Sequence, residues 1–221
     1  MSKIPVYFMP GLAASSSIFE HITLDEALFE THLLEWVLPE EKESLVAYAQ
    51  RMAKNVKHDN AVLIGVSFGG VLVQEMAAFL SLRKLIIISS VKSTAELPRK
   101  MKLAKTTKAY KLVPTGLLQD VDKLIKYAFG DSLKKKLILY ERFLHMRNKE
   151  YLDWAIEQMI CWERTSVDPN VIHIHGDADE VFPSKNIKHF INVKGGTHIM
   201  ILNRFRWFNA NLPKIIVEEA L

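Results

Sequence analysis

One serine of the chain lies between two glycines in a pattern that is typical of a catalytic nucleophile. The pentapeptide Gly65-Val66-Ser67-Phe68-Gly69 fits the pattern G-x-S-x-G, and it lies between an apolar run and a helical pattern. So sharp a strand-to-helix turn brings neighbouring atoms too close for larger side chains at the glycine positions, and it exposes the serine hydroxyl at a helix start. The pattern indicates nucleophilic chemistry at Ser67. A serine helix cap and a degenerate phosphate loop are the alternatives that five residues leave open.

Two later strand ends carry an acid and a base that could serve such a nucleophile. The apolar run 171–175 leads into a turn that holds Asp177 and Asp179, and Gly195-Gly196-Thr197-His198 follows the run 189–193. Serine, aspartate and histidine then occur in the chain order, and at the strand ends, that an acyl-transfer triad on an open α/β sheet requires. The three motifs together predict a Ser-His-Asp arrangement.

Several side chains near these motifs have more than one interpretation. Either Asp177 or Asp179 is placed to orient the histidine, and the other would bond the backbone of its own turn. His173 and His175 precede that turn, where a histidine is more often structural than catalytic. No second pair of ligands stands at metal spacing, so we expect no metal ion. Cys161 has no basic neighbour that would make it reactive.

Short apolar runs and helical patterns alternate along the chain and would position these residues. The runs are rich in β-branched residues and mostly do not alternate with polar ones, which favours parallel strands buried on both faces. Helical patterns over 43–57, with Ser44 as a cap, and over 70–82 lie between them, and 204–221 fits a closing helix. This alternation predicts an α/β sheet with right-handed crossovers. The predicted strands are 6–9, 33–38, 61–66, 85–89, 171–175 and 189–193.

One stretch of about seventy residues interrupts the alternation. Residues 95–164 contain only helical patterns, broken at Pro98, Pro114 and Gly130. A helical segment inserted between two strands is typical of a cap over the carboxyl edge of the sheet. We therefore expect an α/β core made of residues 1–94 and 165–221, and a helical cap made of residues 95–164.

Composition and charge exclude several classes of protein. Hydrophobic residues make up 49% of the 221 residues, far from the composition of disordered chains. The net charge of +4 is too small for a general nucleic-acid binder, and no apolar run reaches the roughly 18 residues of a membrane span. The short, proline-interrupted apolar segment at the N-terminus does not fit a signal peptide, and one cysteine gives no sign of an oxidising compartment. We expect a globular cytoplasmic protein.

The motifs and their order resemble the α/β-hydrolase superfamily, in its small capped esterase and thioesterase branch. The similarity covers the first strand with Pro10-Gly11, the serine turn, the inserted helices, the His-Gly-x-x-Asp turn and the Gly-Gly-Thr-His terminus. It implies Ser67 as the nucleophile, His198 as the base and Asp179 as the acid, because the spacing of the family favours Asp179 over Asp177.

The resemblance also implies an oxyanion hole and a particular sheet. The backbone N–H groups of Leu12 and Phe68 would hold the oxyanion, and Pro10-Gly11 in place of the frequent His-Gly is compatible with this role because the donor is main chain. The N-terminal antiparallel hairpin usual in the family is missing. We therefore expect an open, all-parallel sheet of about six strands with helices on both faces.

The activity that this resemblance implies is cofactor-free hydrolysis of a carboxylic ester or thioester through an acyl-enzyme. Phe19, Trp154 and Met200 are the candidate substrate contacts, and they favour an apolar acyl group. A non-hydrolytic relative, such as a lyase or a cofactor-free perhydrolase, is the alternative within the fold. A binding protein on the same fold whose catalysis has lapsed is the alternative from a different class of function, although such a protein has no need of all three triad residues.

A run of basic residues without acids lies within the expected cap. It has two interpretations: a solvated helix face, or a docking surface for an acidic acyl carrier protein or the phosphates of coenzyme A. Some capped esterases of the superfamily, including the pimeloyl-carrier esterase of biotin synthesis, are similar in having a basic cap. The residues of this basic run are Arg99, Lys100, Lys102, Lys105, Lys108 and Lys111.

Overall fold

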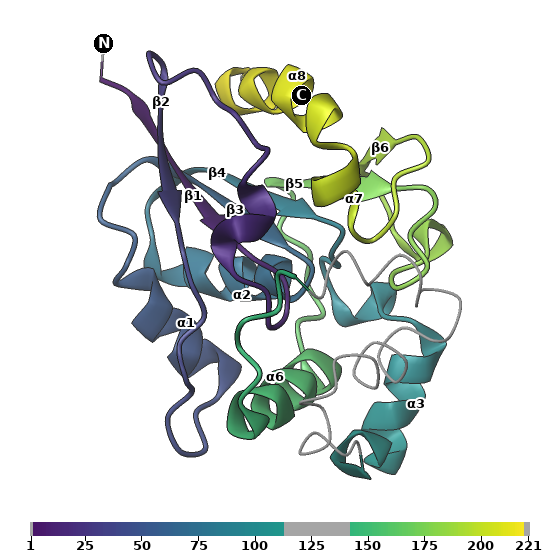
Figure 1. The fold of residues 1–221 in the computed structure, drawn as a ribbon. Coiled ribbons are helices and arrows are strands. Elements are labelled where there is room, and N and C mark those ends of the chain that lie inside the picture. Colours follow the sequence, from purple (N-terminus) through teal and green to yellow (C-terminus); the bar gives the residue numbers. More distant parts are fainter. Residues whose placement is uncertain (1, 113–141, 219–221) are drawn as a thin grey trace.

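The computed structural model describes residues 2–112 and 142–218, and it contains one six-stranded sheet with the strand order β2-β1-β3-β4-β5-β6 (Figure 1). All five neighbouring pairs are parallel. The prediction of an open, all-parallel sheet of about six strands is confirmed. The strands are β1 (Ile4–Met9), β2 (Phe29–Leu33), β3 (Ala61–Val66), β4 (Leu82–Ile88), β5 (Val171–Gly176) and β6 (Ile191–Val193).

The edge strand β2 lies earlier in the chain than the sequence predicted. The expected strand was 33–38, but the register pairs Phe29 with Ile4 and Leu33 with Phe8. Within β2 only the side chain of Phe29 is fully buried, so this edge strand lacks the continuous apolar run that marks the central strands. The apolar residues after Leu33 belong to the loop that leaves the carboxyl end of β2, where Trp36 is buried.

Helices cover both faces of the sheet, as predicted (Figure 1). Leu63 of β3 belongs to a buried cluster with residues of α1 and α2, whereas Ile64 belongs to a second cluster with residues of α8. The Ser44 side chain accepts a hydrogen bond from the Ala47 N–H and caps α1, as the sequence predicted. The helices are η1 (Ser16–Phe19), α1 (Leu45–Ala53), α2 (Phe68–Met76), η2 (Ala77–Phe79), η3 (Thr94–Glu96), α3 (Arg99–Thr107), η4 (Ala109–Leu112), α6 (Lys149–Cys161), η7 (Ser184–Asn186), α7 (Met200–Asn203) and α8 (Phe205–Val217).

The segment between β4 and β5 contacts loops that leave the carboxyl ends of the first two strands. Its residues 113–141 lie outside the described residues, so the cap boundaries of 95–164 stay a prediction. In the described part, Ala14 after β1 bridges Leu144, and the Trp154 indole of α6 donates to the Glu43 carbonyl oxygen at 2.7 Å. Among the described helices, none is long and apolar enough to cross a membrane.

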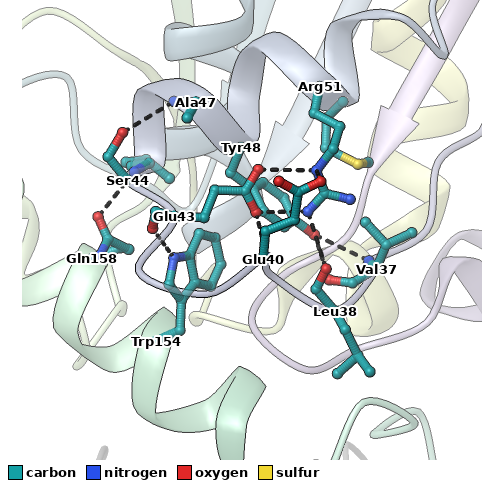
Figure 2. Close-up of polar contacts among 12 residues, drawn as sticks. Val37, Leu38, Glu40, Glu43, Ser44, Ala47, Tyr48, Arg51, Trp154 and Gln158 are labelled. Atoms are coloured by element: carbon teal, nitrogen blue, oxygen red, sulfur yellow. Dashed lines mark hydrogen bonds and ion pairs between the residues drawn. The ribbon is translucent and has the colours of Figure 1, made fainter.

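A polar network joins α6 to the start of α1 and to the loop before it. Figure 2 shows Glu43 paired with the Arg51 guanidinium, at 2.9 Å from Nε and 2.7 Å from Nη2, and Tyr48 donating to the Val37 carbonyl oxygen at 2.8 Å. The Arg51 pairing lowers the pKa of Glu43 against the opposing effect of burial. The network fixes the loop that follows β2 and carries Trp36.

Candidate active site

The serine turn has the strained geometry that its glycines were expected to permit. Ser67 has φ of 54° and ψ of −120°, a conformation uncommon for a residue with a side chain. A Cβ atom at Gly65 would lie 2.4 Å from the Gly69 carbonyl oxygen, and one at Gly69 would lie 2.2 Å from the Pro10 carbonyl oxygen. Both glycines are therefore required by close backbone approach, and the second brings the turn against the loop that follows β1.

Ser67, His198 and Asp179 come together at the carboxyl ends of β3, β6 and β5. Ser67 Oγ lies 2.9 Å from His198 Nε2, and His198 Nδ1 lies 3.0 Å from Asp179 Oδ2. Ser67 stands at the N-cap of α2 but its side chain makes no capping hydrogen bond. The hydroxyl contacts the imidazole instead. The geometry therefore does not favour the interpretation of this serine as a helix cap.

The carboxylate of Asp179 is buried, and each of its two oxygens has a hydrogen-bond partner. Its Oδ1 accepts the N–H groups of Val181 at 2.8 Å and Phe182 at 2.9 Å, while Oδ2 faces His198. Burial alone would raise the pKa of this carboxyl, but the imidazole of His198, together with His175 and the backbone amide, holds the pKa below its usual value. Asp179 is therefore ionised at neutral pH, as a group that orients an imidazole must be.

The other candidate acid lies elsewhere in the same turn. Asp177 is exposed, and its Oδ1 accepts the Gly195 N–H at 2.6 Å while Oδ2 lies 3.4 Å from Asn192 Nδ2. These bonds join the turn after β5 to β6 and to the turn that follows it. Asp177 thus supports the loop that carries His198, and it is Asp179 that contacts the histidine.

The two histidines of β5, His173 and His175, are buried beside the site. His175 donates from Nε2 to the Phe182 carbonyl oxygen at 2.8 Å, which fixes the turn that holds Asp179. The ring nitrogens of His173 have no hydrogen-bond partner among the described residues. Burial lowers the pKa of both imidazoles, so both are neutral at pH 7.

The two amides implied as oxyanion donors lie in neighbouring segments, since a Cβ atom at Gly69 would lie 2.2 Å from the Pro10 carbonyl oxygen. Leu12 belongs to the β1 loop, which we define as residues 10–15, and Phe68 follows Ser67 at the start of α2. Within residues 2–112 and 142–218, neither backbone N–H has a hydrogen-bond acceptor. Both groups are therefore free to donate to a bound ligand.

The three candidate substrate contacts are buried on different sides of the sheet. Phe19 and Met200 belong to the cluster that includes α8, and Trp154 belongs to the cluster that includes α1 and α2. The Trp154 ring lies 6.0 Å from the Phe68 ring, edge on. Their role as substrate contacts stays a prediction.

The side chains of two further residues, which no sequence motif marks, contact the β1 loop. The Trp36 indole donates to the Gly11 carbonyl oxygen at 2.8 Å, and the Tyr151 hydroxyl accepts the Ala13 N–H at 3.2 Å. Neither residue stands at a recognisable spacing from the triad motifs. Their contacts depend on how α6 and the loop after β2 pack, which sequence patterns do not specify.

One group in the described part of the chain could supply ligands to a metal ion. Glu30, His32 and His58 offer donor atoms that lie within 4.8 Å of one another, and Glu30 Oε1 is 3.1 Å from His32 Nε2. Donors around one tetrahedral zinc ion at about 2.1 Å stand about 3.4 Å apart. His58 Nδ1 already has a hydrogen-bond partner, the Tyr7 hydroxyl at 2.7 Å. The group would have to rearrange to hold an ion.

No family model matches the chain, and no curated protein matches it in sequence. Solved structures do match it over nearly its whole length. A hydrolase from Oleispira antarctica has a TM-score of 0.72 at 12% identity, over 99% of this chain and 93% of its own. An esterase from Thermogutta terrifontis has a TM-score of 0.66 at 14% identity, over 97% of this chain and 90% of its own.

An α/β hydrolase enzyme from a Medee basin deep-sea metagenome library has a TM-score of 0.65 at 14% identity, over 100% of this chain and 92% of its own. The matches also include a bromoperoxidase from Bacillus anthracis. The chain therefore has the α/β-hydrolase fold, as its motifs predicted. At this level of identity the likeness is one of fold, so the geometry of the site carries the functional argument.

Proposed function

We propose that the protein is a serine hydrolase that cleaves a carboxylic ester or thioester of an apolar acyl group through an acyl-enzyme. One observation carries this proposal: a continuous chain of contacts from Ser67 Oγ through both nitrogens of His198 to the buried carboxylate of Asp179. A binding protein on this fold would need neither the strained serine nor the ionised, buried acid behind the histidine.

The first half of the reaction forms the acyl-enzyme. His198 Nε2 removes the hydroxyl proton as Ser67 Oγ attacks the acyl carbonyl carbon, and Asp179 stabilises the resulting imidazolium through Nδ1–H. The carbonyl oxygen becomes an oxyanion, which the N–H groups of Leu12 and Phe68 hold. The imidazolium then protonates the leaving alcohol or thiol, the bond to it breaks, and the acyl group stays on Ser67.

The second half repeats the sequence with water as the nucleophile. His198 takes a proton from water as the oxygen attacks the acyl-enzyme, and it returns that proton to Ser67 Oγ when the ester bond breaks. The carboxylic acid leaves. We expect an apolar acyl group, because the candidate substrate contacts Phe19, Trp154 and Met200 are apolar and buried.

The basic run supports a second part of the proposal, an acidic acyl carrier as the partner that delivers the substrate. Lys102 and Lys105 donate to backbone carbonyl groups, of Ala95 at 2.8 Å and of Cys161 at 3.3 Å. Lys111 lies 3.8 Å from Glu157. Arg99, Lys100 and Lys108 are exposed and, among the described residues, have no acidic partner, so these three are the charges that we propose for docking.

Hydrolysis of p-nitrophenyl esters from acetate to decanoate by the wild type and by Ser67→Ala, in parallel, tests the proposal. We expect the variant to lose at least about 10³-fold in kcat/KM. The chain length with the highest kcat/KM would give the size of the acyl site. A folded wild type that hydrolyses no ester of any length would contradict the proposal. If its Ser67 still reacted with a fluorophosphonate, a lyase or perhydrolase would take its place, and if not, a binding protein.

A further inference from the structure

The β1 loop is held from outside by two aromatic side chains. The Trp36 indole donates to the Gly11 carbonyl oxygen at 2.8 Å, and the Tyr151 hydroxyl accepts the Ala13 N–H at 3.2 Å. Ala13 has φ of 60°, in the left-handed region that residues with a Cβ seldom adopt. A loop with this backbone conformation needs such contacts to keep its shape.

The bond from Trp36 fixes the direction of the Leu12 N–H. Gly11 and Leu12 share one peptide unit, which is planar and trans, so its carbonyl oxygen and its N–H point in opposite directions. The Gly11 oxygen accepts both the Trp36 indole and the Ala14 N–H, the latter at 3.1 Å. With the oxygen held on one side, the Leu12 N–H is directed to the other.

The same indole also packs on the residue that carries the second donor. The rings of Trp36 and Phe68 are stacked, with centroids 5.2 Å apart and planes inclined by 7°. The Trp36 side chain is only 5% exposed, and the Tyr151 ring lies against it with centroids 5.5 Å apart. One rigid ring therefore contacts both loops whose N–H groups the proposed function assigns to the oxyanion.

We propose that Trp36 is the positioning residue of the oxyanion hole. It does not touch the substrate; its N–H orients the Leu12 amide, and its ring keeps the Phe68 amide at a constant distance from Leu12. The proposal rests on the proposed function, because an oxyanion hole has a purpose only where an acyl carbonyl is attacked. Preorganised donors stabilise the transition state without reorganisation during the reaction, so losing their alignment lowers the rate.

The variant Trp36→Phe separates the hydrogen bond from the stacking, because phenylalanine keeps an aromatic ring and lacks the N–H. Removing one oxyanion donor outright costs about 10²–10³ in kcat. Since the Leu12 amide is misaligned and not removed, we expect kcat to fall about 10- to 100-fold and KM to stay within about twofold.

A second buried tryptophan supplies the matched control. Trp162 is also 5% exposed and also donates from its indole, but the acceptor is Glu75 Oε1, at 2.9 Å, and not the β1 loop. Trp162→Phe should lower the melting temperature by an amount similar to Trp36→Phe while leaving kcat within about twofold. Tyr151→Phe removes the acceptor of the Ala13 N–H and should also lower kcat. It replaces Trp36→Phe as the test variant if Trp36→Phe folds poorly.

Affinity for an apolar trifluoromethyl ketone distinguishes positioning from general destabilisation. Ser67 Oγ adds to its carbonyl carbon, the hydroxyl proton passes to His198 Nε2, and the ketone oxygen becomes an oxyanion in the hole. We expect Ki to rise in Trp36→Phe by the same factor by which kcat/KM falls. A smaller folded fraction would lower the apparent kcat but would leave Ki unchanged.

Equal kcat and Ki in Trp36→Phe, Trp162→Phe and the wild type would overturn the proposal for Trp36. That outcome is distinct from failure of the proposed function, which would appear as activity that survives Ser67→Ala or as a wild type without activity.

Discussion

At the scale of single residues, the proposed mechanism requires a negative charge on Asp179, because this charge would allow His198 to activate Ser67. Two backbone N–H groups and the imidazole keep this carboxylate ionised although it is buried. An ionised acceptor selects the tautomer that carries a proton on Nδ1 and leaves Nε2 free to accept the proton of Ser67. In the proposed mechanism, the chemistry therefore depends on a residue that does not touch the substrate.

The variant Asp179→Asn tests this dependence. The amide keeps the size of the side chain but cannot stabilise an imidazolium, and it can favour the wrong tautomer of His198. We expect kcat/KM to fall about 10²- to 10⁴-fold on a p-nitrophenyl ester. Asp177→Asn is the control, since Asp177 contacts Gly195 and Asn192 and not the histidine. An equal loss in both variants would contradict the assignment of Asp179.

For Asp179→Asn we also predict a change in how the free energy of unfolding depends on pH in the acid range. Because the pKa of Asp179 is lower in the folded than in the unfolded chain, its ionisation adds to the free energy of unfolding above the unfolded pKa of about 3.9. That contribution is lost as the pH falls through the lower, folded pKa. Urea unfolding between pH 7 and pH 3 should show a shallower decline for Asp179→Asn than for the wild type. Parallel curves would argue against a lowered pKa.

The sequence motifs predicted the residues that meet at the site but not those that hold them. Ser67, Asp179 and His198 each follow the carboxyl end of a strand, and parallel strands bring these ends to one edge of the sheet, so the order of the motifs along the chain is informative. Trp36 lies in a loop and reaches Gly11 through tertiary packing, which no periodicity encodes. The sequence leaves the choice between Asp177 and Asp179 to the family resemblance, because the folding of the turn decides which carboxylate faces the histidine.

At the scale of elements, the loop after β2 depends on the start of α1 and on α6 (Figure 2). The side chain of Glu43 is nearly buried and pairs with Arg51 through both oxygens. Glu43→Gln keeps the shape and removes the charge, so we expect the free energy of unfolding to fall by about 1–2 kcal/mol. Glu41→Gln is the control, because the pair of Glu41 with Lys42 is almost fully exposed. Urea denaturation measures both, and equal values would refute the role of the network.

The edge strand shows where sequence patterns stop being informative. The central strand 61–66 was predicted to the residue, because burial on both faces demands an uninterrupted apolar run. Strand β2 buries only Phe29 and has Glu30 on an exposed and His32 on a half-exposed position, so its composition does not mark it, and the apolar run after it resembles a strand more closely. Local composition identifies buried strands well and edge strands poorly.

At the scale of the whole molecule, the basic run predicts how a carrier-bound substrate would be selected. Reversing Arg99, Lys100 and Lys108 to glutamate should raise KM for an acyl-carrier-protein thioester at least about tenfold, because like charges repel an acidic partner. KM for a p-nitrophenyl ester should stay within about twofold. Equal effects on the two substrates would contradict docking at this surface. The control reverses three exposed lysines outside the basic run, namely Lys3, Lys54 and Lys214.

The central claim is that Ser67 is a nucleophile activated by His198, and covalent labelling tests it most directly. An apolar fluorophosphonate is incubated with the wild type and with Ser67→Ala, and intact and peptide masses are recorded. The account predicts one adduct on the wild type, on the peptide that contains Ser67, and none on the variant, both proteins being folded. A folded wild type that stays unlabelled, or a variant that is labelled equally, would contradict it.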